Sequence, residues 1–277
     1  SMADYTIGFK WWALIIAVVF VISELVCVVC VPERPVACDE KPGKISDMFK
    51  ALFKNDQAMT VVVSIILVYT SLNICGNLVL YFFRFDVGNE GAYSIFAAVA
   101  FAAQVLVMMV IPLLRKRFSK SQLFISGFVI QIAGFAVILI MAFAKLYTPQ
   151  SWYILCLPGI LIYLGYGMLN VIMTIFLSDS VDYGEVMNGT REESVIFSMQ
   201  TFTVKLASGV AVFLAGLVVD WIHLDTAAAV QTQDTLDALR MWMTIPSVIL
   251  LIVGIFVFKR FYKLDDTRME EIKSKLN

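Results

Sequence analysis

The sequence has few of the residue types from which catalytic and metal sites are built. It contains one histidine, His223, and five scattered cysteines. The Cys27 and Cys30 pair has the CxxC spacing but no second ligand pair, so core packing is favoured over metal binding. No nucleophile with its base, phosphate-binding loop or paired hydrolytic carboxylates can be recognised. The sequence therefore indicates neither an enzyme nor a metalloprotein.

Charge of either sign is also scarce. Charged residues make up 16% of the chain, and the formal net charge is -1 at pH 7. No basic patch with interleaved aromatic residues is present, so nucleic acid is not expected as a partner. Hydrophobic residues make up 60%, whereas a soluble domain has about half apolar and about a quarter charged residues. The composition therefore indicates an integral membrane protein in contact with membrane lipid.

Long apolar runs account for most of the chain. A helix needs about 20 apolar residues to cross a bilayer, and seven runs reach that length. They lie near residues 10–31, 57–84, 92–114, 121–145, 151–178, 193–222 and 239–260. The spanning strands of a β-barrel would be about 10 residues long and would alternate apolar and polar residues. The prediction is an all-α integral membrane protein with seven transmembrane helices.

Lysine and arginine are concentrated in the loops on one side of these runs. They gather in residues 33–55, in residues 115–120 and after residue 258. The opposite loops have fewer basic residues, and the loop over residues 220–237 is acidic. Because cytoplasmic loops carry the excess of basic residues, the C-terminus is predicted to be cytoplasmic. The expected location is the cell membrane (inner or plasma membrane), as a multi-pass protein.

Two local patterns suggest structure near the loops. Apolar residues over 42–55 recur at helical spacing with lysines between them, which predicts a short amphipathic helix on the cytoplasmic surface. The alternative is a solvated linker. Residues 190–193 have the capping-box pattern, so a helix is expected to begin there. Gly184 and Gly189 are expected in the turn before it.

Three predicted helices carry polar side chains at helical spacing. The polar stripes are Tyr69, Asn73, Asn77 and Tyr81; Tyr163, Tyr166, Asn170 and Thr174; and Gln200, Thr201, Lys205 and Ser208. A charged side chain at bilayer depth costs at least ~2.5 kcal/mol, so Lys205 is a candidate functional residue. Polar groups in lipid need partners, and stripes at similar depth predict one shared cavity. Such side chains can form hydrogen bonds with the hydroxyl groups of a sugar. The alternative is that they form hydrogen bonds between helices and bind no ligand.

A cluster of charged residues surrounds the turn between the fifth and sixth predicted helices. Its members are Asp179, Asp182, Glu185, Arg191 and Glu193. One interpretation is that these side chains are simply solvated at the membrane surface. The other is a set of ion pairs that closes the cytoplasmic side in one conformation and opens in another. Arg115 or Arg117 could join such a set.

Several motifs together resemble one family of transporters. They are Asp182-Tyr183-Gly184-Glu185, Arg191-x-Glu193-Ser194 and Ser198-x-Gln200-Thr201-x-x-x-Lys205, with similarity also over residues 69–88 and 112–120. The chain resembles the glycoside–pentoside–hexuronide:cation symporters of the major facilitator superfamily. The resemblance extends from about residue 10 to the end. It covers the last helix of the family's N-terminal half and the six helices of its C-terminal half.

The resemblance implies a division of the chain. Residues 1–32 would be the last helix of the N-terminal bundle, and 33–56 a cytoplasmic linker with the amphipathic helix. Residues 57–262 would form the C-terminal six-helix transport bundle, and 263–277 a cytoplasmic tail. The expected partners are the missing N-terminal six-helix half or a second copy of the chain. The chain is thus expected to be half of a larger transporter of the major facilitator fold.

The resemblance also implies a function, which is cation-coupled sugar symport by alternating access. Lys205, Gln200 and Thr201 fall on the family's sugar site, and Asn170 stands where a sugar-facing tryptophan is expected. The expected substrate-binding residues are Lys205, Thr201, Gln200, Asn170, Tyr166, Asn73, Asn77 and Tyr69. The expected cytoplasmic gate is Asp179, Asp182, Glu185, Arg191, Glu193 and Arg117. No cofactor is expected, and the coupling cation, sodium or a proton, would bind mainly in the missing half.

Two alternatives to sugar symport stay open at this point. Some relatives of the family carry amphipathic cargo, so the chain could belong to a lipid or lysolipid transporter on the same scaffold. A wide apolar opening beside the polar stripes would favour that alternative. The chain could instead be an orphan half that serves as a structural membrane subunit.

Overall fold

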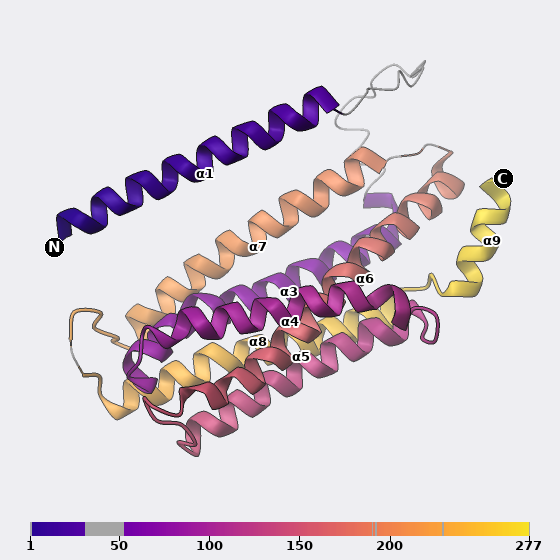
Figure 1. Cartoon of the computed structure of the whole chain (residues 1–277). Coiled ribbons are helices and arrows are strands. Elements are labelled where there is room, and N and C mark those ends of the chain that lie inside the picture. Colours follow the sequence, from indigo (N-terminus) through magenta and orange to yellow (C-terminus); the bar gives the residue numbers. More distant parts are fainter. Residues whose placement is uncertain (1, 31–52, 190, 192, 229, 277) are drawn as a thin grey trace. The chain divides into compact units, whose positions relative to one another are not determined.

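A computed structural model describes residues 2–30, 53–189, 191, 193–228 and 230–276 (Figure 1). Throughout these ranges the regular structure is helical, and they contain no strand. The chain divides into two units, residues 1–43 and 44–277. Each unit is considered by itself below.

The first unit contains one long helix, α1 (Met2–Cys30). From Ile7 to Cys30 its sequence is apolar on nearly every side, with Lys10 and Glu24 as its charged residues, and no side chain in that range is buried. A helix that is apolar all round is suited to lipid or to the interior of a helix bundle. Cys27 and Cys30 are both free thiols on this helix.

The second unit is a bundle of helices joined by short turns (Figure 1). Its elements are α3 (Asp56–Tyr81), the π-helix η1 (Phe82–Val87), α4 (Ala92–Leu114), α5 (Lys120–Phe143), the 3-10 helix η2 (Trp152–Leu155), α6 (Cys156–Asn188), α7 (Glu193–Trp221), α8 (Gln233–Phe261) and α9 (Asp266–Leu276). Consecutive long helices run in opposite directions. We call the end with the α4–α5 turn the Lys120 end, and the end with η1 the Asp86 end.

Seven helices in the described ranges are long and apolar enough to cross a membrane. They span Ile7–Cys30, Asp56–Val87, Ala92–Leu114, Lys120–Phe143, Trp152–Asn188, Glu193–Trp221 and Gln233–Phe261. The predicted all-α membrane fold with seven spans is therefore confirmed. The predicted amphipathic helix over 42–55 and the capping box over 190–193 lie partly outside the described residues.

The sequence prediction placed the end of α6 too early. The helix continues to Asn188 rather than ending near residue 178. Gly184 was expected in a turn, but it is a buried helical residue. It leaves room for the Asn55 side chain, whose amide nitrogen would lie 2.8 Å from an added Cβ and donates a 2.8 Å hydrogen bond to the Ser180 carbonyl. Gly189 ends the helix with φ +73°, as its predicted role in the turn requires.

The start of α8 was also predicted too late. The helix begins at Gln233, and Thr232 caps it by accepting a hydrogen bond from the Thr235 backbone amide. The first turns of α8 are polar, so a search for apolar runs does not detect them. As a result Arg240 lies inside the helix, where only 2% of it is exposed.

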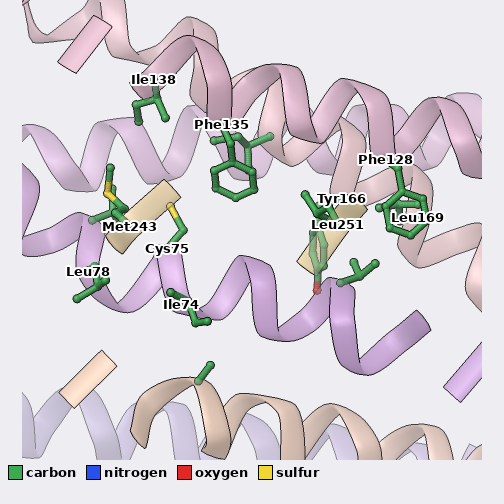
Figure 2. Close-up of a cluster of buried hydrophobic side chains, with 14 of the residues drawn as sticks. Ile74, Cys75, Leu78, Phe128, Phe135, Ile138, Tyr166, Leu169, Met243 and Leu251 are labelled. Carbon is green, nitrogen blue, oxygen red and sulfur yellow. The ribbon is translucent and has the colours of Figure 1, made fainter. Parts of the chain in front are cut away.

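The core of the second unit is built around α6. Small residues let α5 approach closely, since a Cβ added to Gly165 would lie 2.5 Å from the Gly127 carbonyl oxygen. Figure 2 shows large apolar side chains, among them Phe128, Phe135 and Leu169, filling the space between the helices. This packing holds α6 in a fixed position within the bundle.

The C-terminal helix α9 packs against the end of α6. Leu264, Met269 and Ile272 are buried and contact Tyr183, Val186 and Tyr262. The segment was predicted only as a tail. In the structure it is part of the Lys120 end of the bundle.

Candidate functional site

The polar stripes of α3 and α6 meet at a partly buried position between the two helices. The Asn170 amide donates a 2.5 Å hydrogen bond to the Tyr69 hydroxyl. The Tyr69 and Tyr166 rings pack edge to face, with 5.5 Å between their centroids. Tyr166 comes from the α6 side of the core, with its hydroxyl directed toward α3 (Figure 2). Three of the predicted substrate-binding residues therefore form one cluster.

The stripe of α7 joins this cluster through Gln200. Its side-chain nitrogen lies 3.4 Å from the Thr174 hydroxyl of α6, which is a long hydrogen bond. Thr201 donates to the Phe197 carbonyl of its own helix at 3.3 Å. Thr201 and Lys205 are exposed on the same face, one turn apart. Lys205 makes no ion pair with any residue that the structure describes.

Asn73 and Asn77 have side-chain oxygens that can accept further hydrogen bonds. The Asn73 amide nitrogen donates to the Tyr69 carbonyl at 2.7 Å, and the Asn77 nitrogen donates to the Asn73 carbonyl at 2.7 Å. Both side chains are thus held against their own helix. Their oxygens have no hydrogen-bond donor among the described residues. The cluster can therefore accept hydrogen bonds from a polyhydroxylated ligand.

Four of the predicted gate residues meet at the Lys120 end. Arg191 Nη1 lies 2.8 Å from Glu185 and 3.1 Å from Asp182, and Arg191 Nε lies 3.1 Å from Glu193. The hydrogen bond with Glu185 has the largest influence and raises the pKa of Arg191 above its ordinary value. The Arg191 side chain is 46% exposed, so solvent competes for these contacts. We call these four residues the Arg191 cluster.

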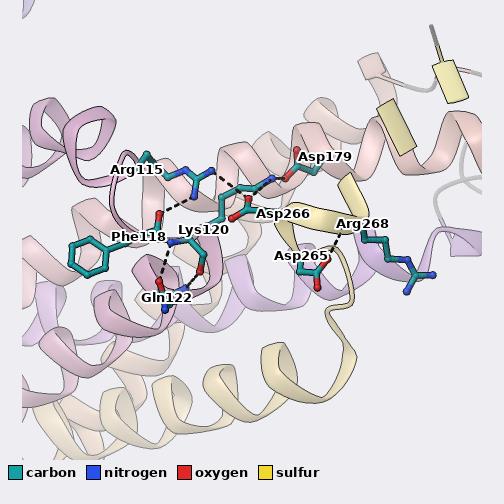
Figure 3. Close-up of polar contacts among 9 residues, drawn as sticks. Arg115, Phe118, Lys120, Gln122, Asp179, Asp265, Asp266 and Arg268 are labelled. Carbon is teal, nitrogen blue, oxygen red and sulfur yellow. Dashed lines mark hydrogen bonds and ion pairs between the residues drawn. The ribbon is translucent and has the colours of Figure 1, made fainter. Parts of the chain in front are cut away.

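Asp179 belongs to a different and buried set of charges (Figure 3). It pairs with Lys120, and the side chains of both residues are less than one-tenth exposed. Lys120 also lies 3.5 Å from Asp266 of α9, and Asp266 lies 3.3 Å from Arg115. Arg117 is exposed and forms no ion pair within the described part of the chain. Of the predicted gate residues, four therefore form the Arg191 cluster, Asp179 belongs to the buried set, and Arg117 joins neither.

A buried ion pair at the Asp86 end was not foreseen from the sequence. The Arg240 guanidinium contacts both carboxylate oxygens of Asp86, at 2.8 Å and 2.5 Å, and contacts Asp237 at 2.7 Å. The Tyr147 hydroxyl donates to Asp86 at 2.6 Å. Burial, followed by the hydrogen bond to Asp86, raises the pKa of Tyr147. The available signal for this pair was Arg240 itself, a lone arginine at the start of the apolar run predicted over 239–260.

The described residues contain no candidate metal-binding site. No group of three or more histidine, cysteine, aspartate or glutamate side chains could hold a metal ion there. The polar cluster on α3, α6 and α7 consists mainly of neutral hydrogen-bonding groups. That chemistry suits a neutral, hydroxylated ligand rather than an ion.

The sequence matches the family described as MFS/sugar transport protein over residues 5–266. The chain belongs to this family. Its members are transport proteins and not enzymes, and the predicted relationship to the glycoside–pentoside–hexuronide symporters is confirmed. The match includes the seven spans of the described ranges and ends at Asp266, the first residue of α9.

Several named sugar carriers are similar to the chain. A raffinose carrier protein of Pediococcus pentosaceus is 24% identical over 276 residues, which cover 97% of this chain and 42% of that protein. An isoprimeverose transporter of Lactiplantibacillus pentosus is 25% identical, over 93% of this chain and 52% of the transporter. A lactose permease of Lactobacillus delbrueckii is 24% identical, over 97% and 42%. The chain spans about half the length of the curated relatives it matches.

Proposed function

We propose that the chain is the C-terminal half of a carrier that imports a sugar together with a cation by alternating access. The observation that carries this proposal is the polar cluster of α3, α6 and α7, together with the exposed Lys205 on the same helix as Gln200. Membership in a sugar-transport family supports it. The other bundle would then be a six-helix N-terminal half or a second copy of the chain.

The position of Lys205 supports a role in substrate binding. Lys205 lies 12 residues after Glu193, which is the first residue of α7 (205 - 193 = 12). At 1.5 Å per residue this is about 18 Å along the helix, close to the middle of a hydrocarbon core about 30 Å thick. An ammonium at this depth needs a counter-charge. We assign that counter-charge to an acidic side chain of the other half, near the coupling cation.

The chemistry of the cluster fits a sugar. Lys205, Thr201 and Gln200 would hydrogen-bond ring hydroxyls, while the side-chain oxygens of Asn73 and Asn77 would accept from others. The Tyr69 and Tyr166 rings would cover the apolar face of the sugar ring. The relatives named above carry raffinose, isoprimeverose or lactose, and we propose a substrate of the same class for this chain. The coupling cation, sodium or a proton, would bind mainly outside it.

The Arg191 cluster is proposed to act as a cytoplasmic gate. Its ion pairs would close the Lys120 end in one conformation and separate in the other. This assignment places the Lys120 end and the C-terminus in the cytoplasm of a cell whose inner or plasma membrane holds the protein. The excess of Lys and Arg in the loops at that end supports the orientation.

Replacement of Lys205 by alanine tests the proposal in the protein as its own cells express it. We expect Lys205→Ala to abolish cation-coupled sugar uptake, because the substituted side chain can neither hydrogen-bond the sugar nor reach the counter-charge. The bundle itself should stay folded, since Lys205 pairs with no described residue, and the melting temperature checks this. Val210→Ala, on an exposed part of the same helix, is the matched control. Wild-type uptake by Lys205→Ala would refute the assignment.

A second candidate function is the transport of a lipid or lysolipid. A groove of about 550 Å³ lies beside the polar stripe of α3, between that helix, α7 and α8. Its lining is apolar and includes Ile74, Leu214, Trp242 and Ile245. An acyl chain could lie there while a polar headgroup reached the cluster. Thermal stabilisation by lysophosphatidylcholine, with none by any sugar of a panel, would favour this candidate over the first.

A further inference from the structure

Exposed basic side chains gather where α8 ends, at the Lys120 end of the bundle. Lys259 and Arg260 lie in the last turn of α8, and both are exposed. Neither makes an ion pair with any residue that the structure describes. Lys263 follows the helix, and its Nζ lies 3.8 Å from the Asp56 carboxylate, a contact between two exposed side chains for which water competes. The end of α8 therefore presents a positively charged surface.

The segment before α3 adds another positive charge at this place. Gln57, in the first turn of α3, accepts a 2.8 Å hydrogen bond from the Lys263 backbone amide and donates a 3.3 Å hydrogen bond to the Phe261 carbonyl. These bonds hold the start of α3 against the end of α8. Lys54 is exposed and lies three residues before Gln57 (57 - 54 = 3). We call the four basic residues of this place the Arg260 junction: Lys54, Lys259, Arg260 and Lys263.

An exposed apolar stripe of α8 leads from the Arg260 junction toward the middle of the membrane. Ile249, Val253 and Phe256 are all exposed. They lie on the face of Arg260, because residues three, four and seven positions apart share one face of a helix. Ile249, at the far end of the stripe, also lines the apolar groove of about 550 Å³ between α3, α7 and α8. The stripe therefore connects a positive surface with an apolar groove.

The length of this stripe matches one leaflet of a bilayer. Arg260 and Ile249 are 11 residues apart (260 - 249 = 11), which is about 16 Å along the helix. The hydrocarbon core is about 30 Å thick, so each leaflet contributes about 15 Å. A phospholipid with its phosphate at Arg260 therefore places the ends of its acyl chains at the near end of the groove. A soluble anion gains nothing from the stripe.

The charge of the junction selects the headgroup. Guanidinium and ammonium groups bind phosphate through charge-assisted hydrogen bonds, and an arginine can do so with two parallel bonds. The Arg260 guanidinium lies over the Phe261 ring, 5.7 Å from its centroid. One lysine or arginine near the surface strengthens the binding of an anionic membrane lipid about fivefold. A zwitterionic lipid lacks most of this attraction because its headgroup carries no net charge.

We propose that the Arg260 junction and the apolar stripe of α8 form a binding site for an anionic phospholipid of the leaflet at the Lys120 end. The phosphate contacts Lys259 and Arg260, and an acyl chain lies along Phe256, Val253 and Ile249. The site differs from the route of a lipid cargo considered above, because the headgroup of such a cargo would lie at the central polar cluster. It is therefore independent of what the protein transports.

Titration of lipid into the purified, detergent-solubilised protein, as its cells express it, tests the site. The probes are phosphatidylglycerol and phosphatidylcholine with the same acyl chains, and native mass spectrometry measures the affinity of the most tightly bound lipid. We expect the wild type to bind phosphatidylglycerol about tenfold or more tightly than phosphatidylcholine. Lys259→Gln combined with Arg260→Gln should weaken phosphatidylglycerol binding about tenfold or more, with phosphatidylcholine binding within about twofold of wild type.

Lys116→Gln combined with Arg117→Gln is the matched control. Both residues are exposed in the α4–α5 turn at the same end of the bundle, so the control removes the same charge from the same leaflet. The other two basic residues of that turn are already paired with aspartates. Phosphatidylglycerol binding should stay within about twofold of wild type. Melting temperatures without lipid show which variants are folded. Arg260→Gln alone, with an expected loss of about fivefold, decides if the double variant is not.

Three outcomes would overturn the proposal. Equal losses in the two double variants would show attraction to positive charge in general rather than to the junction. Equal affinities of the wild type for the two lipids would show that the headgroup is not selected. Displacement of phosphatidylglycerol by millimolar glycerol 1-phosphate would show that an anion alone binds and that the stripe contributes nothing. Sugar uptake is not measured, so failure here leaves the sugar-carrier proposal standing.

Discussion

The two ends of the bundle hold ion pairs of different character. At the Asp86 end, Asp86 and Arg240 are each 3% exposed at the side chain, and their contact is bidentate. At the Lys120 end, the Arg191 side chain is 46% exposed and forms ion pairs with three carboxylates. Separating a buried pair leaves an uncompensated charge in the interior, whereas water replaces an exposed partner at little cost. The Asp86–Arg240 pair is therefore costly to separate, whereas the contacts of Arg191 are not.

The Lys120–Asp179 pair lies between these two cases. It is buried as the Asp86 pair is, but Lys120 also contacts Asp266, whose side chain is 40% exposed. Asp266 also contacts Arg115, so α9 joins the ends of α4, α5 and α6 (Figure 3). The Lys120 end thus combines the buried Lys120–Asp179 pair with the contact between Lys120 and Asp266, which solvent can reach.

The largest expected effect comes from breaking the buried pair at the Asp86 end. We expect Arg240→Met to lower the free energy of unfolding by about 3–5 kcal/mol, because the Asp86 carboxylate would be left buried without a counter-charge. Adding Asp86→Leu to Arg240→Met should recover most of that loss. Chemical unfolding in detergent, followed by tryptophan fluorescence, measures both variants.

A second arginine near the same end provides the matched control. Arg84 is 43% exposed at the side chain and lies 3.8 Å from Glu90. Arg84→Met should change the free energy of unfolding by less than about 1 kcal/mol. Equal losses in Arg84→Met and Arg240→Met would contradict the distinction between buried and exposed pairs.

An intermediate effect is expected from acid on the contact between α9 and the bundle. Burial raises the pKa of Asp266, but the charges of Arg115 and Lys120 outweigh it, so the net pKa is lowered. An unfolded aspartate has a pKa of about 3.9, so the stabilisation from Asp266 is present above about pH 4. It is lost as the pH falls through the lowered pKa. The protection of the α9 amides, which is the ratio of the intrinsic exchange rate at each pH to the observed rate, should therefore fall in acid.

Neutralising Asp266 should reproduce part of this effect at pH 7. We expect Asp266→Asn to weaken the attachment of α9 by about 1 kcal/mol, a small value because the side chain is partly solvated. Glu270→Gln, at an exposed position of the same helix, should leave the exchange rates unchanged. Slow exchange in Asp266→Asn at neutral pH would show that apolar packing alone holds α9.

The smallest effect on stability is expected from Arg191→Ala. Because the Arg191 cluster is exposed, the free energy of unfolding should change by less than about 1 kcal/mol. The rate of sugar exchange across the membrane should change clearly, while equilibrium sugar affinity should not. Lys116→Ala, at an exposed position of the α4–α5 turn, is the control. An affinity loss equal to that of Lys205→Ala, with unaltered rates, would argue against a gate.

Local patterns in the sequence were enough to predict the helices. Long apolar runs identified all seven spans, because burial in lipid requires them along the whole helix. The ends of the helices were predicted less well where an apolar run gives way to charged residues. The helix α6 continues through Asp179 and Asp182 because both side chains form ion pairs. Similarly, the polar first turns of α8 conceal the entry of Arg240 into the core.

Contacts between distant segments could not be read from those patterns. Polar periodicity indicated which faces of α3 and α6 carry polar side chains, but not that Tyr69 and Asn170, 101 residues apart, would form a hydrogen bond. Asp86 and Arg240 are separated by 154 residues, and Lys120 and Asp179 by 59. Such pairs depend on how the helices are arranged in the bundle. For the same reason Asp179 was grouped with Arg191, its neighbour in sequence, rather than with Lys120.

The close approach of Gly127 and Gly165 has a mechanical consequence. It couples α5 to α6 without room for sliding, so the two helices tilt as one stiff lever. The same lever carries Asn170 near mid-membrane and Glu185 at its tip, 15 residues further on (185 - 170 = 15), or about 22 Å. If the proposed substrate contacts Asn170, a slight rotation of the helix there would move the Arg191 cluster by a larger distance. In the proposed carrier, helix stiffness would then link substrate binding to the gate without a relay of side chains.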